Sequence, residues 1–234
     1  QGNSDLDYKL ENLSSIRDFN CLQKRLRAHR IWFYNILYKE GLIDHGLISM
    51  NPCEHKSSYF EGKWLTADEI QESNKLLPLL VYGKNNNERD DSYYIRRITD
   101  QVFKDSWVSV ISEASFGDSD GTVFLSEKIF KPIACLHPFI VVGNKNSLAH
   151  LRELGYKTFD GFIDESYDSL PTFERFEAII RAIKKVIAIP NKVEWYRSMQ
   201  DILLHNYNVL KENSNKDSLA KAILEKKYKE YFKL

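Results

Sequence analysis

The chain has only three cysteines, no excess of either charge, and no long apolar run. Cys21, Cys53 and Cys135 are far apart and single, which excludes both a disulfide framework and a C-x-x-C metal pattern and favours a reducing, cytoplasmic location. Lys and Arg number 33 and so do Asp and Glu, so no overall field draws the protein to nucleic acid. The apolar run near residues 139–143 is too short to span a bilayer, and no basic-then-apolar leader precedes it.

What is present is an alternation of strand and helix patterns. β-Branched or apolar runs at residues 18–22, 46–50, 107–112, 138–143 and 156–160 predict strands. Helical spacing predicts helices after residue 30, from Thr66, over residues 93–103, after Ser126, and from Ser147 to Gly155. This alternation predicts an α/β protein with a doubly wound parallel sheet of the Rossmann-like kind.

Three segments follow from this pattern. Residues 1–16 are expected to be a polar N-terminal segment or linker, and residues 17–170 a Rossmann-like domain. Residues 171–234 are expected to be a helical C-terminal extension packed on that domain and interrupted near Pro190. Residues 51–91, rich in Pro, Gly and Asn, are expected to be irregular apart from one helix.

Polar residues follow several predicted strands. In an open parallel sheet, ligands bind beyond the carboxyl ends of the strands, and residues 23–30, 113–128 and 144–147 fall at such ends. Glu127 and Lys128 lie in the first turn of a helix that Ser126 can cap, where backbone N–H groups favour an anion. Arg30, at another helix start, has the forked guanidinium that binds phosphate. These residue types suit a nucleoside diphosphate, although a solvated surface would also explain them.

The stretch WVSVISEASFGDSDGTVFLSEKIFKP, residues 107–132, resembles the donor-binding motif of the α1,3-fucosyltransferases. In that family a strand ends in Phe-Glu-Asn, and Tyr-(Val/Ile)-Thr-Glu-Lys opens the next helix. Here the matching elements are Ser112-Glu113-Ala114 and Leu125-Ser126-Glu127-Lys128, and Arg30 matches the arginine that binds the donor diphosphate. Exostosin-like and other viral or bacterial sugar transferases show a similar order of elements.

The resemblance implies a GT-B-type glycosyltransferase that moves a sugar from a nucleoside-diphosphate sugar to a glycan or polysaccharide hydroxyl. It implies a ribose contact for Glu127, diphosphate contacts for Lys128 and Arg30, and a catalytic position near the sugar for Glu113. Ser126, Lys24 and Arg25 join the expected donor-binding set. No cofactor or metal is expected beyond the donor itself.

Several alternatives stay open. Asp118-Ser119-Asp120 has the letters of a metal-binding Asp-x-Asp, and residues 164–168 form an acidic loop that could receive an acceptor or solvate a turn. Residues 226–229 are basic and could contact an acidic membrane surface peripherally, or face solvent. Ala114 stands where the family has Asn, so the resemblance does not identify the sugar or the base of the donor. Because no acceptor half is evident, a non-catalytic nucleotide-sugar-binding or scaffold module is the alternative function.

Overall fold

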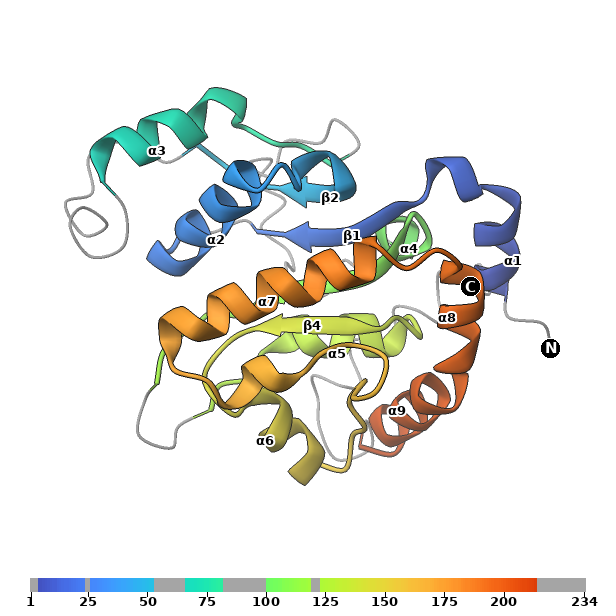
Figure 1. Ribbon diagram of the computed structural model, residues 1–234. Helices are drawn as coiled ribbons and strands as arrows, with labels where there is room; N and C mark the ends of the chain where they lie inside the picture. Colours follow the sequence, from blue (N-terminus) through green and yellow to red (C-terminus); the bar gives the residue numbers. More distant parts are fainter. Residues whose placement is uncertain (1–3, 24–25, 53–65, 82–99, 119–122, 214–234) are drawn as a thin grey trace, which may run out of the picture.

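The computed structural model describes residues 4–23, 26–52, 66–81, 100–118 and 123–213. Within them, β1 (Arg17–Leu22), β2 (Gly46–Ser49), β3 (Ser106–Ser112) and β4 (Phe139–Val142) form one sheet in the order β2-β1-β3-β4. Every pairing is parallel, and the strand arrows in Figure 1 accordingly point the same way. The predicted α/β class and parallel, Rossmann-like sheet are therefore confirmed.

The sheet is buried between helices. All residues of β3 and β4 are buried, as expected for strands covered on both faces. Figure 1 shows α7 (Thr172–Ile187) in front of the sheet and α5 (Glu127–Ala134) behind β4. The apolar side chains of these layers belong to one core cluster that extends along the chain from Leu6 to Leu210.

The strand order has one reversal point that matters for function. The chain passes from β1 through α2 (Ala28–Lys39) to β2 on one side, and from β3 through α5 to β4 on the other. β1 and β3 are hydrogen-bonded neighbours, with Asn20 beside Ser109. The loops that leave their carboxyl ends diverge in opposite directions, which is the position where doubly wound sheets bind ligands.

Shorter elements connect the sheet strands. They are η2 (Ile43–His45), α3 (Ala67–Ser73), η3 (Asn74–Leu76) and α4 (Asp100–Lys104). The predicted cap at Thr66 is confirmed, because its Oγ1 accepts from the Glu69 N–H at 3.3 Å while Glu69 Oε2 accepts from the Thr66 N–H at 2.9 Å. Residues 93–99 of the predicted helix 93–103 lie outside the described residues.

The described part of the polar N-terminal segment, residues 4–16, forms helical structure that the sequence pattern did not predict. Here α1 (Ser4–Glu11) and η1 (Leu13–Ser15) precede β1, and α1 packs on α4. Lys9 is 1% exposed, and its ammonium donates to the carbonyls of Phe103 (2.7 Å), Lys104 (2.8 Å) and Ser106. A cation at the carbonyl end of α4 is electrostatically favoured, so the polar helix α1 is held against α4 by the charge of Lys9.

The predicted strand at residues 156–160 is wrong. Only an isolated bridge, Asp160 to Ile163, occurs there among the described residues. The backbone of Lys157 bonds to a side chain instead, because its N–H donates to Asn206 Oδ1 (2.7 Å) and its carbonyl accepts from Asn206 Nδ2 (2.8 Å). An asparagine of the C-terminal helices thus replaces the partner strand that the sequence pattern suggested.

The chain from Thr172 onward is helical as predicted, as far as it is described. α6 (Ser147–Glu153) and η4 (Ser166–Ser169) precede α7, which is followed by α8 (Lys192–Ser198) and α9 (Gln200–Asn213). The predicted interruption near Pro190 is confirmed by the gap between α7 and α8. Residues 214–234, with the basic residues 226–229, lie outside the described part. None of the described helices has the length and apolar character needed to cross a bilayer.

Candidate functional site

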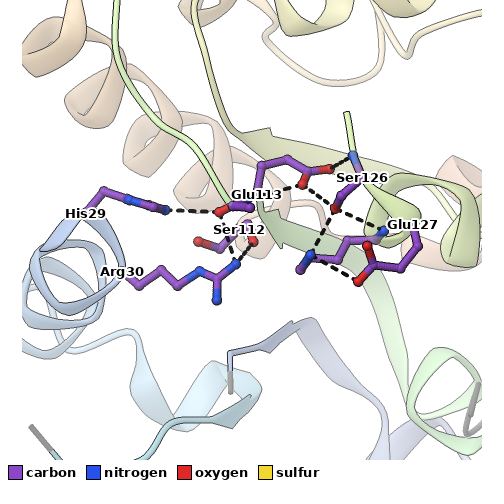
Figure 2. A network of polar contacts seen from close by, with 8 residues as sticks. His29, Arg30, Ser112, Glu113, Ser126 and Glu127 are labelled. Carbon is purple, nitrogen blue, oxygen red and sulfur yellow. Dashed lines mark hydrogen bonds and ion pairs between the residues drawn. The ribbon is translucent and has the colours of Figure 1, made fainter. Parts of the chain in front are cut away.

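Arg30 joins the start of α2 to the end of β3. Its side chain is 4% exposed, and Nη2 donates to the carbonyls of Ser112 at 2.8 Å and Glu113 at 3.0 Å. Figure 2 shows Arg30 and His29 reaching from α2 toward Glu113 on one side, with Ser126 and Glu127 on the other. The arginine at the predicted phosphate position therefore lies at the reversal point of the sheet.

His29 supports the same carbonyl. Its Nε2 lies 3.0 Å from the Glu113 carbonyl oxygen, and its ring stacks on Phe116 with centroids 5.8 Å apart. Burial, with smaller effects from the charges of Arg30 and Arg27, lowers the pKa of His29 to about 4, although the hydrogen bond to the Glu113 carbonyl acts in the opposite direction. The ring is therefore neutral at pH 7, and a carbonyl acceptor requires the proton on Nε2.

Arg30 lies close to other charged groups. Burial has the largest effect on its pKa and lowers it, and the charge of Arg27 lowers it further, whereas Glu113 and Glu127 raise it. A guanidinium keeps its proton at neutral pH in such surroundings. The site therefore contains a permanent, nearly buried cation with carboxylates nearby.

Glu113 uses its carboxylate to hold the start of α5. The residue is 0% exposed; Oε1 accepts from the Ser126 N–H at 3.1 Å, and Oε2 accepts from Ser126 Oγ at 2.5 Å. Oε2 also lies 3.3 Å from the Ala114 N–H. These contacts are those of a strand-end carboxylate that caps the following segment, so in this arrangement Glu113 positions α5.

The predicted first turn of α5 is present. Ser126 is the N-cap residue, and its Oγ accepts from the Lys128 N–H at 3.4 Å and from Lys128 Nζ at 2.9 Å. Lys128 Nζ also lies 3.1 Å from Glu127 Oε1, with side chains 28% and 23% exposed respectively. Burial alone would raise the pKa of Glu127, but the charges of Lys128 and Lys131 outweigh it, so the pKa is lowered.

Five of the predicted residues thus come together in one polar network. The network runs from Arg30 through Glu113 and Ser126 to Lys128 and Glu127, and it joins the segments after β1 and β3. The other two predicted donor residues, Lys24 and Arg25, lie outside the described residues.

Asp118, the first residue of the Asp-x-Asp alternative, has other partners. Its Oδ1 pairs with Arg175 Nη1 at 3.0 Å, and its Oδ2 accepts from the Thr172 N–H at 3.0 Å, at the start of α7. Asp120 falls outside the described residues. Across the described ranges, no group of three or more His, Cys, Asp or Glu side chains could hold a metal ion.

The acidic loop at residues 164–168 makes structural contacts. Asp168 accepts from the N–H groups of Leu148 and Ala149, at 2.8 and 2.9 Å, in the first turn of α6. Glu165 accepts from the Phe159 N–H at 2.6 Å, and Asp164 pairs with Lys185 at 2.6 Å. Glu165 and Asp168 are buried and hold neighbouring backbone groups, so these two carboxylates do not solvate the turn.

Arg175 is a residue of this region that the sequence reasoning missed. It is 1% exposed, donates to the Gly117 carbonyl at 3.0 Å, and lies over the Phe116 ring at 4.6 Å. It therefore fixes the loop after β3 against α7. The signal was present, because Arg175 lies on the apolar stripe of α7 with Ile179 and Ile183, where a solvated arginine is not expected.

Comparison of the chain with protein-family models, with curated proteins and with solved structures gave no match.

Proposed function

We propose that this chain binds a nucleoside-diphosphate sugar and acts as a glycosyltransferase toward a hydroxyl of a glycan or polysaccharide, through a GT-B-type donor domain. The observation that supports this most is the convergence of two separate segments on Glu113. Arg30 comes from the helix after β1, and the Ser126–Lys128 turn comes from the helix after β3. Both lie at the reversal point, where such sheets bind nucleotides.

In this proposal the diphosphate binds between Arg30 and Lys128. Lys128 leaves its contacts with Ser126 and Glu127 to meet the phosphate, with the amino end of α5 behind it. Glu127, whose lowered pKa keeps it ionised, accepts from the ribose hydroxyls. Arg30 and Lys128 thus supply positive charge for the diphosphate, and Glu127 supplies negative charge for the ribose hydroxyls.

The chemical step follows from these charges. An acceptor hydroxyl attacks the anomeric carbon, the bond from that carbon to the diphosphate oxygen breaks, and the hydroxyl proton passes to the departing diphosphate or to water. Negative charge grows on the departing nucleoside diphosphate, where Arg30, Lys128 and the α5 dipole stabilise it. Glu113 acts here as a positioning residue, because its buried carboxylate is bonded to Ser126.

A second candidate is a non-catalytic module that binds a nucleotide sugar. The burial of the Glu113 carboxylate favours it, because the family resemblance had assigned the catalytic position to that residue. The two candidates share the donor site and differ only in turnover.

Thermal-shift screening with nucleoside diphosphates and their sugars tests the shared site. A ligand at 100 times its Kd stabilises the folded state by about 2.7 kcal/mol, which raises the melting temperature measurably. Slow donor hydrolysis by the wild-type protein, lost in Lys128→Ala, supports the enzyme; tight binding without turnover supports the module. No shift with any nucleotide at millimolar concentration refutes both.

A further inference from the structure

Several buried polar atoms have no hydrogen-bond partner within the described part of the chain, and two of them belong to the carboxyl ends of β1 and β3. They are Oε1 of Gln23, directly after β1, and Oγ of Ser112, the last residue of β3. The two side chains are 1% and 2% exposed. Buried polar atoms are normally paired, so two exceptions at the same edge of the sheet require an explanation.

The two residues lie at the ends of neighbouring strands. Asn20 and Ser109 form the last pair of the β1–β3 ladder, and Gln23 and Ser112 each lie three residues further along the chain, at the same carboxyl edge of the sheet. Arg30 bonds to the Ser112 carbonyl, so the cation of the proposed diphosphate site adjoins this pair.

The geometry points to a specific role: we propose that Gln23 and Ser112 bind hydroxyl groups of the sugar carried by the donor. This inference rests on the proposed function. A sugar hydroxyl both donates and accepts, so it pairs with an amide oxygen and with a serine hydroxyl, whichever way the amide is turned. A phosphate only accepts, and the neighbouring Arg30 suits it better.

The partners already present at Gln23 are weak. Its Nε2 lies 3.2 Å from the sulfur of Cys21, whose thiol is a poor hydrogen-bonding group. Because the Gln23 and Ser112 atoms are shielded from solvent, the Gln23 side chain must rotate when the sugar binds. A side chain with no strong bond to break can do so at little cost.

Strand β3 offers a matched control. Ser109 is as buried as Ser112, but its Oγ contacts Asn20 Nδ2 at 3.0 Å and His137 Nδ1 at 2.9 Å. Ser109→Ala should lower the melting temperature, because it leaves those partners unpaired. Ser112→Ala and Gln23→Met should leave the melting temperature unchanged or raise it, since each removes an unpaired polar atom.

Calorimetric titration of these variants with GDP, GDP-fucose, UDP and UDP-glucose tests the inference. The wild-type protein should bind one sugar nucleotide tighter than its parent diphosphate, and Ser112→Ala and Gln23→Met should each weaken the sugar nucleotide about tenfold while leaving the diphosphate unchanged. Ser109→Ala should keep the wild-type ratio. Sugar-nucleotide affinity unchanged in both variants, or lost equally with the diphosphate, overturns the inference and leaves the proposed function standing. Wild-type protein that binds none of the four compounds overturns both.

Discussion

Arg30 donates to the backbone carbonyl of Glu113 at 3.0 Å, while the carboxylate of the same Glu113 binds the cap residue of α5. One residue therefore fixes the two segments that carry the cations of the proposed donor site. A shift of the Glu113 backbone or side chain changes the spacing of Arg30 and Lys128, and this would change the affinity for a diphosphate bound between them.

Glu113→Gln and Ser126→Ala should each weaken nucleoside-diphosphate binding by about 1–2 kcal/mol, because both interrupt the path from Glu113 through Ser126 to Lys128. The double variant should cost less than the sum, since the residues act in one chain of contacts. Calorimetry of the four proteins measures the cycle. Strict additivity, or a loss of turnover in Glu113→Gln at unchanged donor affinity, contradicts the positioning role.

Lys128→Ala should weaken nucleoside-diphosphate binding by about 2 kcal/mol, roughly thirtyfold, because it removes a charge-assisted bond to phosphate. The fold should be retained, since this side chain is partly exposed. The control is Lys184→Ala on α7, which removes an exposed ion pair with Glu40 and should leave the affinity unchanged. Equal affinity of the Lys128 variant and the wild type argues against the assignment.

Glu127→Ala should remove the preference for ribose over 2′-deoxyribose nucleotides. A carboxylate that accepts from the 2′-hydroxyl contributes about 1–2 kcal/mol that the deoxy compound cannot gain. Competition titrations with GDP and 2′-deoxy-GDP, or with the uridine pair, measure this ratio. A variant that loses affinity for both sugars in equal proportion speaks against a ribose contact.

Stability should fall as the pH is lowered from about 6.5 toward 3. Burial lowers the pKa of His137 to about 3, with the nearby charge of Lys9 adding to the effect, and His29 is lowered to about 4. Below pH 6.5, the ordinary histidine pKa, these histidines are protonated in the unfolded chain but stay neutral in the folded chain. Protonation therefore favours unfolding, and the full stability is present only above pH 6.5. For each of the two histidines, the unfolding free energy should fall by about 2 kcal/mol when the pH is lowered from 7 to 5.

Urea unfolding at several pH values checks this dependence. His137→Asn should lower stability at pH 7, because contacts to Ser109 and Ser106 are changed, but it should flatten the pH slope. A variant with the wild-type slope would show that His137 does not contribute to it.

Lys9→Met should lower the unfolding free energy by about 2–3 kcal/mol, because three carbonyl oxygens lose a buried ammonium donor. Lys39→Met, which removes an exposed pair with Glu69, should cost less than about 1 kcal/mol. Denaturant unfolding of both variants gives the comparison. Equal effects would mean that α1 does not contribute through Lys9.

The sequence predicted what depends on local pattern and missed what depends on distant partners. The strands ending at Leu22, Ser49, Ser112 and Val142 and the Ser126 cap follow from apolar runs and neighbouring residues. α1 was missed because Lys9 finds its partners about 95 residues away, at Lys104. The false strand at residues 156–160 arose because its true partner is one side chain, Asn206.

The candidate site was predictable in its members but not in its contacts. Placing Arg30 and Glu127 together required only the rule that ligands bind at the carboxyl ends of parallel strands. The sequence could not reveal that Glu113 turns its carboxylate inward to Ser126, since that depends on the path of the loop between them. Gln23 and Ser112, the proposed sugar-binding residues, were not predicted because neutral polar side chains carry no distinctive pattern.

The carboxylate of Asp168 has a wider consequence. It already supplies the negative charge that the first turn of α6 attracts, by accepting from Leu148 and Ala149. At α5 the cap is the neutral hydroxyl of Ser126, with Lys128 in the first turn. Both helix starts therefore already have a carboxylate partner, Asp168 at α6 and Glu113 at α5, and the difference between them is Lys128, whose cation would have to leave Ser126 and Glu127 to attract a phosphorylated ligand toward the β1–β3 boundary.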